Sequence, residues 1–122
     1  MNPIIHFEIP FDDKEKAMKF YKEVFGWEFQ DIPEMNYVIA QTGETDPKTF
    51  MLKKPGMING GMYKRDENSA KSPVLVIDVP NIDEHLEKIK SHGGTIFREK
   101  TQVGDMGFYA QVKDTEGNII GV

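Results

Sequence analysis

A histidine and two carboxylates stand at matching points of two similar segments, and they are the side chains best suited to chemistry. His6 and Glu8 lie in the segment 4–9, where apolar and polar residues alternate as in a β-strand that presents both side chains on one face. Asp78 stands at the position equivalent to Glu8 in the segment 74–79. Imidazole titrates near neutral pH, so a histidine beside a carboxylate can transfer protons. His6, Glu8 and Asp78 are therefore our candidate catalytic residues.

Other roles for these side chains stay open at this point. His6 could be a metal ligand, an acid–base or hydrogen-bonding group in a cavity, or a structural histidine bonded to a backbone carbonyl. Glu8 and Asp78 could also lie near their strand ends and be solvated or paired with Lys or Arg. His85 and His92 fall near the start and the end of a predicted helix, without a second ligand at metal-binding spacing, and we interpret both as surface residues.

The composition excludes several other classes of function. The chain has no cysteine, which excludes disulfides, zinc–thiolate sites, iron–sulfur clusters and a cysteine nucleophile. No serine stands in a Gly-x-Ser-x-Gly setting, and no glycine-rich nucleotide-binding motif occurs. A net charge of −5 disfavours binding to nucleic acids and to anionic membranes. The start of the chain lacks a basic segment followed by an apolar one, so we expect a cytoplasmic protein.

The 122 residues predict one α+β domain in which a strand, a helix and about three strands occur twice. In module one (1–64), Pro10 is expected to end the first strand and Gly26 the helix, which begins after Asp12 or Asp13. Strands are predicted at 27–29, 37–40 and 58–63, with a further short one at 50–52. A polar linker, 65–72, leads to module two (73–122), with a strand at 74–79, a helix capped by Asn81 or Asp83, and strands at 95–99, 107–113 and 118–122.

The two modules also align residue by residue at three places. HFEIP at 6–10 aligns with VIDVP at 76–80, GWEF at 26–29 with GTIF at 94–97, and GMING at 56–60 with GNIIG at 117–121. Two such halves can enclose a cavity between their sheets. The alternative is an ordinary α+β domain whose halves match by chance.

Two of these segments resemble a known family. FYKEVFGWEF with the preceding IIHFEIP is similar to the opening module of vicinal-oxygen-chelate proteins, the glyoxalase, bleomycin resistance and extradiol dioxygenase superfamily. DTEGNIIGV is similar to their final turn and strand, although Thr115 stands where proline is common. The resemblance implies paired βαβββ modules, curved mixed sheets with a cavity on their concave side, and a homodimer.

The metal ligands of that family do not carry over to this chain. The resemblance implies one ligand on the first strand and one on the last strand of each module. The first-strand positions are His6 and Val76, and the last-strand positions are Gly60 and Gly121. Only His6 can bind a metal ion, and one imidazole does not make a site. We therefore expect no cofactor, with a divalent metal disfavoured.

We expect the protein to bind a small organic ligand in the cavity without a metal, as resistance-type relatives do. Alternatives are a lyase, isomerase or dioxygenase-type enzyme that uses His6 with Glu8 or Asp78, and a dimeric interaction module without a ligand. Besides the catalytic candidates, strand alternation predicts six ligand-binding residues on the cavity wall: Tyr37, Ile39, Met62, Val76, Phe108 and Ala110.

Overall fold

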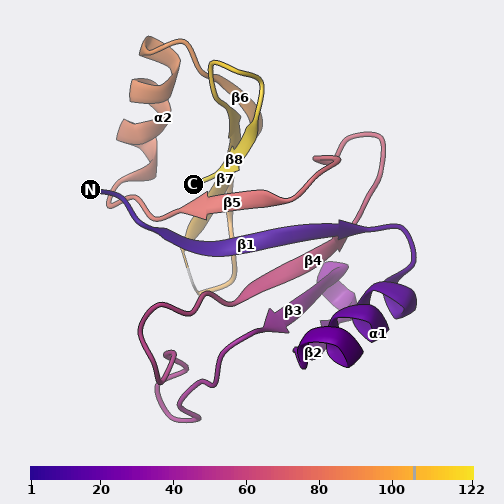
Figure 1. Ribbon diagram of the computed structural model, residues 1–122. Helices are drawn as coiled ribbons and strands as arrows, with labels where there is room; N and C mark the ends of the chain where they lie inside the picture. The colour runs from indigo at the N-terminus through magenta and orange to yellow at the C-terminus, as the bar shows by residue number, and fades with distance from the viewer. Residues whose placement is uncertain (106) are drawn as a thin grey trace. The chain divides into compact units, whose positions relative to one another are not determined.

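The computed structural model describes residues 1–105 and 107–122, which form two compact units (Figure 1). The N-terminal unit is His6–Pro73, and the C-terminal unit is Val74–Val122 together with Met1–Ile5. Two hydrogen bonds attach Met1–Ile5 to the rest of the C-terminal unit. The amide of Asp78 donates to the carbonyl of Pro3 at 2.9 Å, and Asn2 Nδ2 donates to the carbonyl of Asp78 at 3.1 Å.

The N-terminal unit contains a strand, a helix and three further strands. Its elements are β1 (Ile4–Phe11, of which His6–Phe11 belong to this unit), α1 (Lys14–Phe25), β2 (Glu28–Ile32), the short 3-10 helix η1 (Pro33–Met35), β3 (Tyr37–Gln41) and β4 (Gly60–Lys64). The strand order is β2-β3-β4-β1. The first two pairs are antiparallel, and β4 with β1 is parallel.

The C-terminal unit repeats this plan. Its elements are β5 (Val74–Ile77), α2 (Ile82–Ser91), β6 (Thr95–Gln102), β7 (Phe108–Lys113) and β8 (Ile119–Gly121), and the strand order is β6-β7-β8-β5. Again the first two pairs are antiparallel and the last is parallel. The predicted α+β class with two βαβββ modules is therefore confirmed.

Both helices begin at a side-chain cap. Asp13 accepts a hydrogen bond from the amide of Lys16 at 3.1 Å, and Gly26, with a φ of 73°, ends α1 in the left-handed conformation. Asn81, rather than Asp83, caps α2. Within the described residues, neither helix is long and apolar enough to cross a lipid bilayer.

The sequence predicted that the first strand ends at Pro10, but in the structure it extends to Phe11. Pro10 pairs with Tyr63, and β1 continues to Phe11, whose carbonyl accepts a hydrogen bond from the amide of Arg65 at 2.8 Å. Successive residues of a strand direct their backbone groups to opposite sides. Since Phe11 bonds toward β4, the nitrogen of Pro10 points away from β4, and this ladder does not need the missing N–H group. The segment 50–52 forms only a single bridge, between Leu52 and Thr45.

Each helix covers one face of the sheet of its own unit, and the core lies in that layer. In the N-terminal unit, Ala17, Met18 and Tyr21 of α1 pack against the buried side chains of the sheet, which are Phe11, Val38, Ala40 and Met62. In the C-terminal unit, the buried cluster of Leu86, Ala110, Val112 and Val122 forms the same layer with α2. We call the opposite side of each sheet the non-helix face of that unit.

Candidate functional site

Four predicted site residues share the non-helix face of the N-terminal unit. Gly61 pairs with Glu8 of β1 on one side and with Ile39 of β3 on the other. His6 lies two residues from Glu8, and Tyr37 lies two residues from Ile39, so all four side chains emerge on this face. Three neighbouring strands thus bring together His6, Glu8, Tyr37 and Ile39.

A hydrogen bond joins His6 to Tyr37 on this face. The distance between His6 Nε2 and Tyr37 Oη is 2.9 Å. The ring of Tyr37 lies directly over Gly61, because a Cβ atom added to Gly61 would be 1.9 Å from Tyr37 Oη. The sequence identified Tyr37 as a ligand-binding candidate, but alternation alone could not predict its bond to His6. Only a residue without a side chain fits beneath the ring in this arrangement.

The surroundings favour the neutral form of His6. Burial lowers the pKa of His6 below its ordinary value, and the negative charge of Glu8 opposes this effect. Glu8 is itself only 8% exposed. A neutral imidazole has one donor nitrogen and one acceptor nitrogen, so the tautomer decides whether Nε2 or the Tyr37 hydroxyl donates their shared hydrogen. Such a pair can bind a polar group, or accept a proton from one.

The family resemblance implies a metal ligand on the last strand of each module, and in the N-terminal unit the sequence predicted this position at Gly60. The structure places it one residue further, at Gly61. Gly60 pairs with Phe7 and lies on the helix side, where an added Cβ would be 2.6 Å from the Phe7 ring. The position next to Glu8 on the non-helix face is Gly61. The prediction for Gly60 was therefore wrong by one residue, but the corrected position also lacks a side chain.

Three residues predicted on the cavity wall lie on the wrong face for that role. Met62 is fully buried in the core beneath α1, and Ala110 is fully buried in the core beneath α2. Phe108 stands two residues from Ala110 on β7 and shares its side; its ring is 56% exposed, with Lys100 Nζ 4.8 Å from the centroid. The alternation on β4 and β7 was assigned one residue out of phase, which reverses the face of every side chain.

The non-helix face of the C-terminal unit carries residues that the sequence analysis missed. Gly121 pairs with Val76 and with Gln111, so Val76 is on the predicted face. Tyr109 lies close to Gly121, since an added Cβ there would be 2.9 Å from the tyrosine ring. Strand alternation could have identified Tyr109 and Gln111, because they stand on either side of the buried Ala110 and therefore face the opposite side of the sheet. Asp78 follows the end of β5 and is exposed.

These donors do not fit a divalent metal site of the vicinal-oxygen-chelate kind. In the described part of the chain, no three His, Asp or Glu side chains are grouped so that they could hold an ion. The N-terminal unit offers His6, whose Nε2 is bonded to Tyr37, and Glu8. Val76 and Gly121 in the C-terminal unit offer no donor atom. A catalytic metal ordinarily needs three protein ligands.

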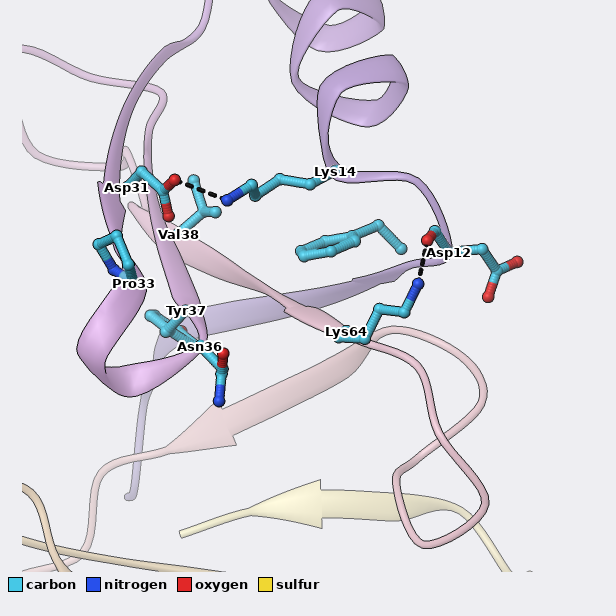
Figure 2. A pocket seen from close by; sticks show the side chains of 9 residues that line it. Asp12, Lys14, Asp31, Pro33, Asn36, Tyr37, Val38 and Lys64 are labelled. Atoms are coloured by element: carbon cyan, nitrogen blue, oxygen red, sulfur yellow. Dashed lines mark hydrogen bonds and ion pairs between the residues drawn. The ribbon is translucent and has the colours of Figure 1, made fainter.

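A separate groove of about 290 Å³ lies beside the N-terminal end of α1 (Figure 2). Lys14 Nζ and Asp31 Oδ2 form an ion pair across it at 2.6 Å, and Lys64 donates to the carbonyl of Asp12. Tyr37 lines this groove and is also hydrogen-bonded to His6. Because both lysines already have oxygen partners, we do not assign a ligand to this groove.

Known proteins resemble this chain in sequence and in fold. Residues 4–43 match the family model described as bleomycin resistance protein-like N-terminal. A glyoxylase-like domain-containing protein from Didymella fabae is 30% identical over 117 residues, which are 91% of this chain and 84% of that protein. A probable chloroplastic lactoylglutathione lyase from Arabidopsis thaliana is 30% identical over 100 residues, 80% of this chain but only 28% of that protein.

A solved structure shares the fold. It is a glyoxalase/bleomycin resistance protein/dioxygenase superfamily member from Vibrio splendidus 12B01, with a TM-score of 0.61 and 12% identity over 99% of this chain and 97% of that one. Its similarity extends over both βαβββ modules, and the Didymella protein matches most of the sequence. The chain therefore belongs to the glyoxalase/bleomycin resistance, or vicinal-oxygen-chelate, superfamily.

Proposed function

We propose that this protein binds a small organic ligand without a metal, on the non-helix face of the N-terminal unit. The observation that carries this proposal is the 2.9 Å hydrogen bond between His6 Nε2 and Tyr37 Oη above Gly61. It engages Nε2 of His6, the first-strand residue at the ligand position that the resemblance implies, and it fills the space of a side chain at position 61 with an aromatic ring. A metal ion would have to displace Tyr37 to reach this nitrogen.

The side chains on this face indicate the chemistry of the ligand. The neutral His6–Tyr37 pair offers hydrogen-bond donors and acceptors without a full charge. Ile39 is 37% exposed and offers apolar surface on the same face. Small-molecule sites commonly combine apolar walls with a few polar points. We therefore expect a compact ligand that carries a hydroxyl or carbonyl group beside an apolar part.

Titration calorimetry and NMR test this proposal together. Zinc and nickel should show no stoichiometric binding with sub-micromolar affinity to the parent protein. A panel of small hydroxy and keto compounds should shift the NMR signals of His6 and Ile39, and Tyr37→Phe should weaken these shifts. Tight stoichiometric metal binding that is lost in His6→Ala would contradict the proposal.

A second candidate function is acid–base catalysis of the lyase, isomerase or dioxygenase type, with His6 as the base. It is favoured by the charge of Glu8, which raises the pKa of His6 against the effect of burial. Lactoylglutathione is the first substrate to test, because it appears in the name of the Arabidopsis relative. His6→Ala should abolish any turnover. Unchanged turnover in that variant would remove His6 from the mechanism.

We further propose that the protein is a homodimer, as the family resemblance implies, and that it is cytoplasmic. Light scattering of the purified chain should give twice the monomer mass of 13.9 kDa. A dimer that binds none of the compounds tested would instead favour an interaction module without a ligand. A monomer at all concentrations would contradict this proposal.

A further inference from the structure

The side-chain amide of Gln111 has an unsatisfied acceptor in the C-terminal unit. Gln111 is 6% exposed, and its Oε1 atom is buried without a hydrogen-bond partner among the described residues. A buried acceptor without a partner is destabilising, and native proteins rarely keep one without a reason. The other end of the amide is engaged, because Nε2 donates to Tyr109 Oη at 3.0 Å.

The neighbours of Gln111 include both polar and apolar residues, and Arg98 of β6 pairs with Gln111 on one side. Gln111 pairs with Gly121 across β7 and β8, and Gly121 pairs with Val76 of β5. Tyr109 lies near Gly121, as Tyr37 lies over Gly61 in the N-terminal unit. Each unit thus places a tyrosine hydroxyl, hydrogen-bonded to a second polar side chain, beside a glycine of its last strand.

We propose that the Gln111 amide is a second ligand-contact point, at which Oε1 accepts a hydrogen bond from an N–H or O–H group of a neutral organic molecule. The amide and the Tyr109 hydroxyl carry no charge, and Val76 beside them is apolar and 7% exposed. An anion would face the lone pairs of Oε1, and a cation would approach Arg98, the β6 partner of Gln111. A neutral amide or hydroxyl group instead regains the hydrogen bond that it leaves in water. A ligand can reach the buried Oε1 only if a neighbouring side chain moves, and the half-buried Tyr109, which is hydrogen-bonded to the same amide, is the side chain that we expect to move.

NMR of the full ¹⁵N-labelled chain tests this inference with two related amides, of which only one has N–H donor groups. Acetamide carries N–H donors and N,N-dimethylacetamide carries none. Acetamide should shift the side-chain NH₂ signals of Gln111 and the backbone amide of Gly121, and N,N-dimethylacetamide should not. Gln111→Met should weaken acetamide binding by about tenfold, which is the effect of losing one hydrogen bond.

Matched variants separate this role from a structural one. Gln102→Met removes an exposed glutamine of the same unit, one that donates to the carbonyl of Gly104, and should leave acetamide binding unchanged. Gln111→Met should unfold at about the same urea concentration as the parent, because removal of the unsatisfied acceptor offsets loss of the hydrogen bond to Tyr109 Oη. If Gln111→Met does not fold, Tyr109→Phe keeps Oε1 and should keep the acetamide shifts.

The expected results do not depend on the N-terminal unit, so His6→Ala should retain the acetamide shifts at Gln111. Their persistence while His6-dependent binding fails would separate this inference from the proposed function. Equal shifts with both probes, or none with acetamide, would overturn it. A clearly larger loss of stability in Gln111→Met than in Tyr109→Phe, which loses the same hydrogen bond, would overturn it as well, because it would mean that a bound water or a protein group already satisfies Oε1.

Discussion

Adding one carbon atom at position 61 tests the central contact of the candidate site, because Gly61 lies beneath the ring of Tyr37. A Cβ there would be 1.9 Å from Tyr37 Oη and 2.0 Å from Cζ. To reach an ordinary contact of 3.4 Å, the hydroxyl must move by about 1.5 Å. A shift of that size disrupts its 2.9 Å hydrogen bond with His6 Nε2.

The cost follows from this displacement. Gly61→Ala should lower the free energy of unfolding by about 1–3 kcal/mol, the usual cost of overpacking a buried position, of which about 1 kcal/mol is the lost hydrogen bond. Tyr37→Leu lacks the ring atoms that obstruct the new carbon. In that background Gly61→Ala should be neutral or stabilising by up to about 1 kcal/mol, because alanine loses less backbone freedom than glycine in a strand. The coupling between the two positions should therefore be about 2 kcal/mol.

Urea unfolding of the parent, the two single variants and the double variant measures this coupling. Gly121→Ala serves as the matched control, because its Cβ would be 2.9 Å from Tyr109 and 3.0 Å from Val76, so a smaller movement suffices. An NMR titration of the His6 imidazole should show a changed pKa in Gly61→Ala. The reasoning is refuted if Gly61→Ala is as stable as the parent and Tyr37→Leu leaves its effect unchanged.

Three further predictions concern pH, packing and capping. Burial lowers the pKa of His6, so the stability that its neutral form contributes is complete above the ordinary pKa of 6.5 and is lost as the pH falls through the lowered pKa. Between these two pH values, the urea midpoint of the parent should fall more than that of His6→Gln. Met62→Ala should cost about 2–5 kcal/mol in urea unfolding, whereas the part-exposed Ile39→Ala should cost about 1 kcal/mol or less. Asp13→Ala should cost about 1 kcal/mol and speed amide hydrogen exchange in the first turn of α1.

The sequence predicted the elements and their repetition well, because strong local signals mark them. Asp13 and Gly26 bound α1 through a side-chain cap and a left-handed residue, both of which act within one helical turn. The turn before β8 depends on Asp114, which accepts hydrogen bonds from the amides of Glu116 and Asn118 at 2.8 and 2.9 Å. Such signals depend on neighbours in sequence, so one chain is enough to find them.

The faces of β4 and β7 could not be predicted in the same way. Gly60 and Gly61 are adjacent and have no side chains, so neither indicates which side of β4 faces the helix. On β7, Phe108 and Tyr109 are adjacent aromatic residues, and either could be the buried one. Pairing with neighbouring strands decides the phase, and that information is distant in sequence. The site residues on these strands were consequently the ones misplaced.

The packing of Tyr37 gives a physical reason why the N-terminal unit lacks a last-strand donor. A side chain at position 61 and the ring of Tyr37 compete for one volume, since even a single added carbon overlaps the hydroxyl at 1.9 Å. A carboxylate at that position would have to expel the ring before it could approach an ion near His6. Tyr109 and Gly121 stand in the same relation in the C-terminal unit, although a Cβ added to Gly121 would be 2.9 Å from the ring and so would overlap it less. An aromatic hydroxyl and a metal-binding carboxylate are therefore alternative occupants of equivalent places in the two modules, and this chain holds the hydroxyl in both.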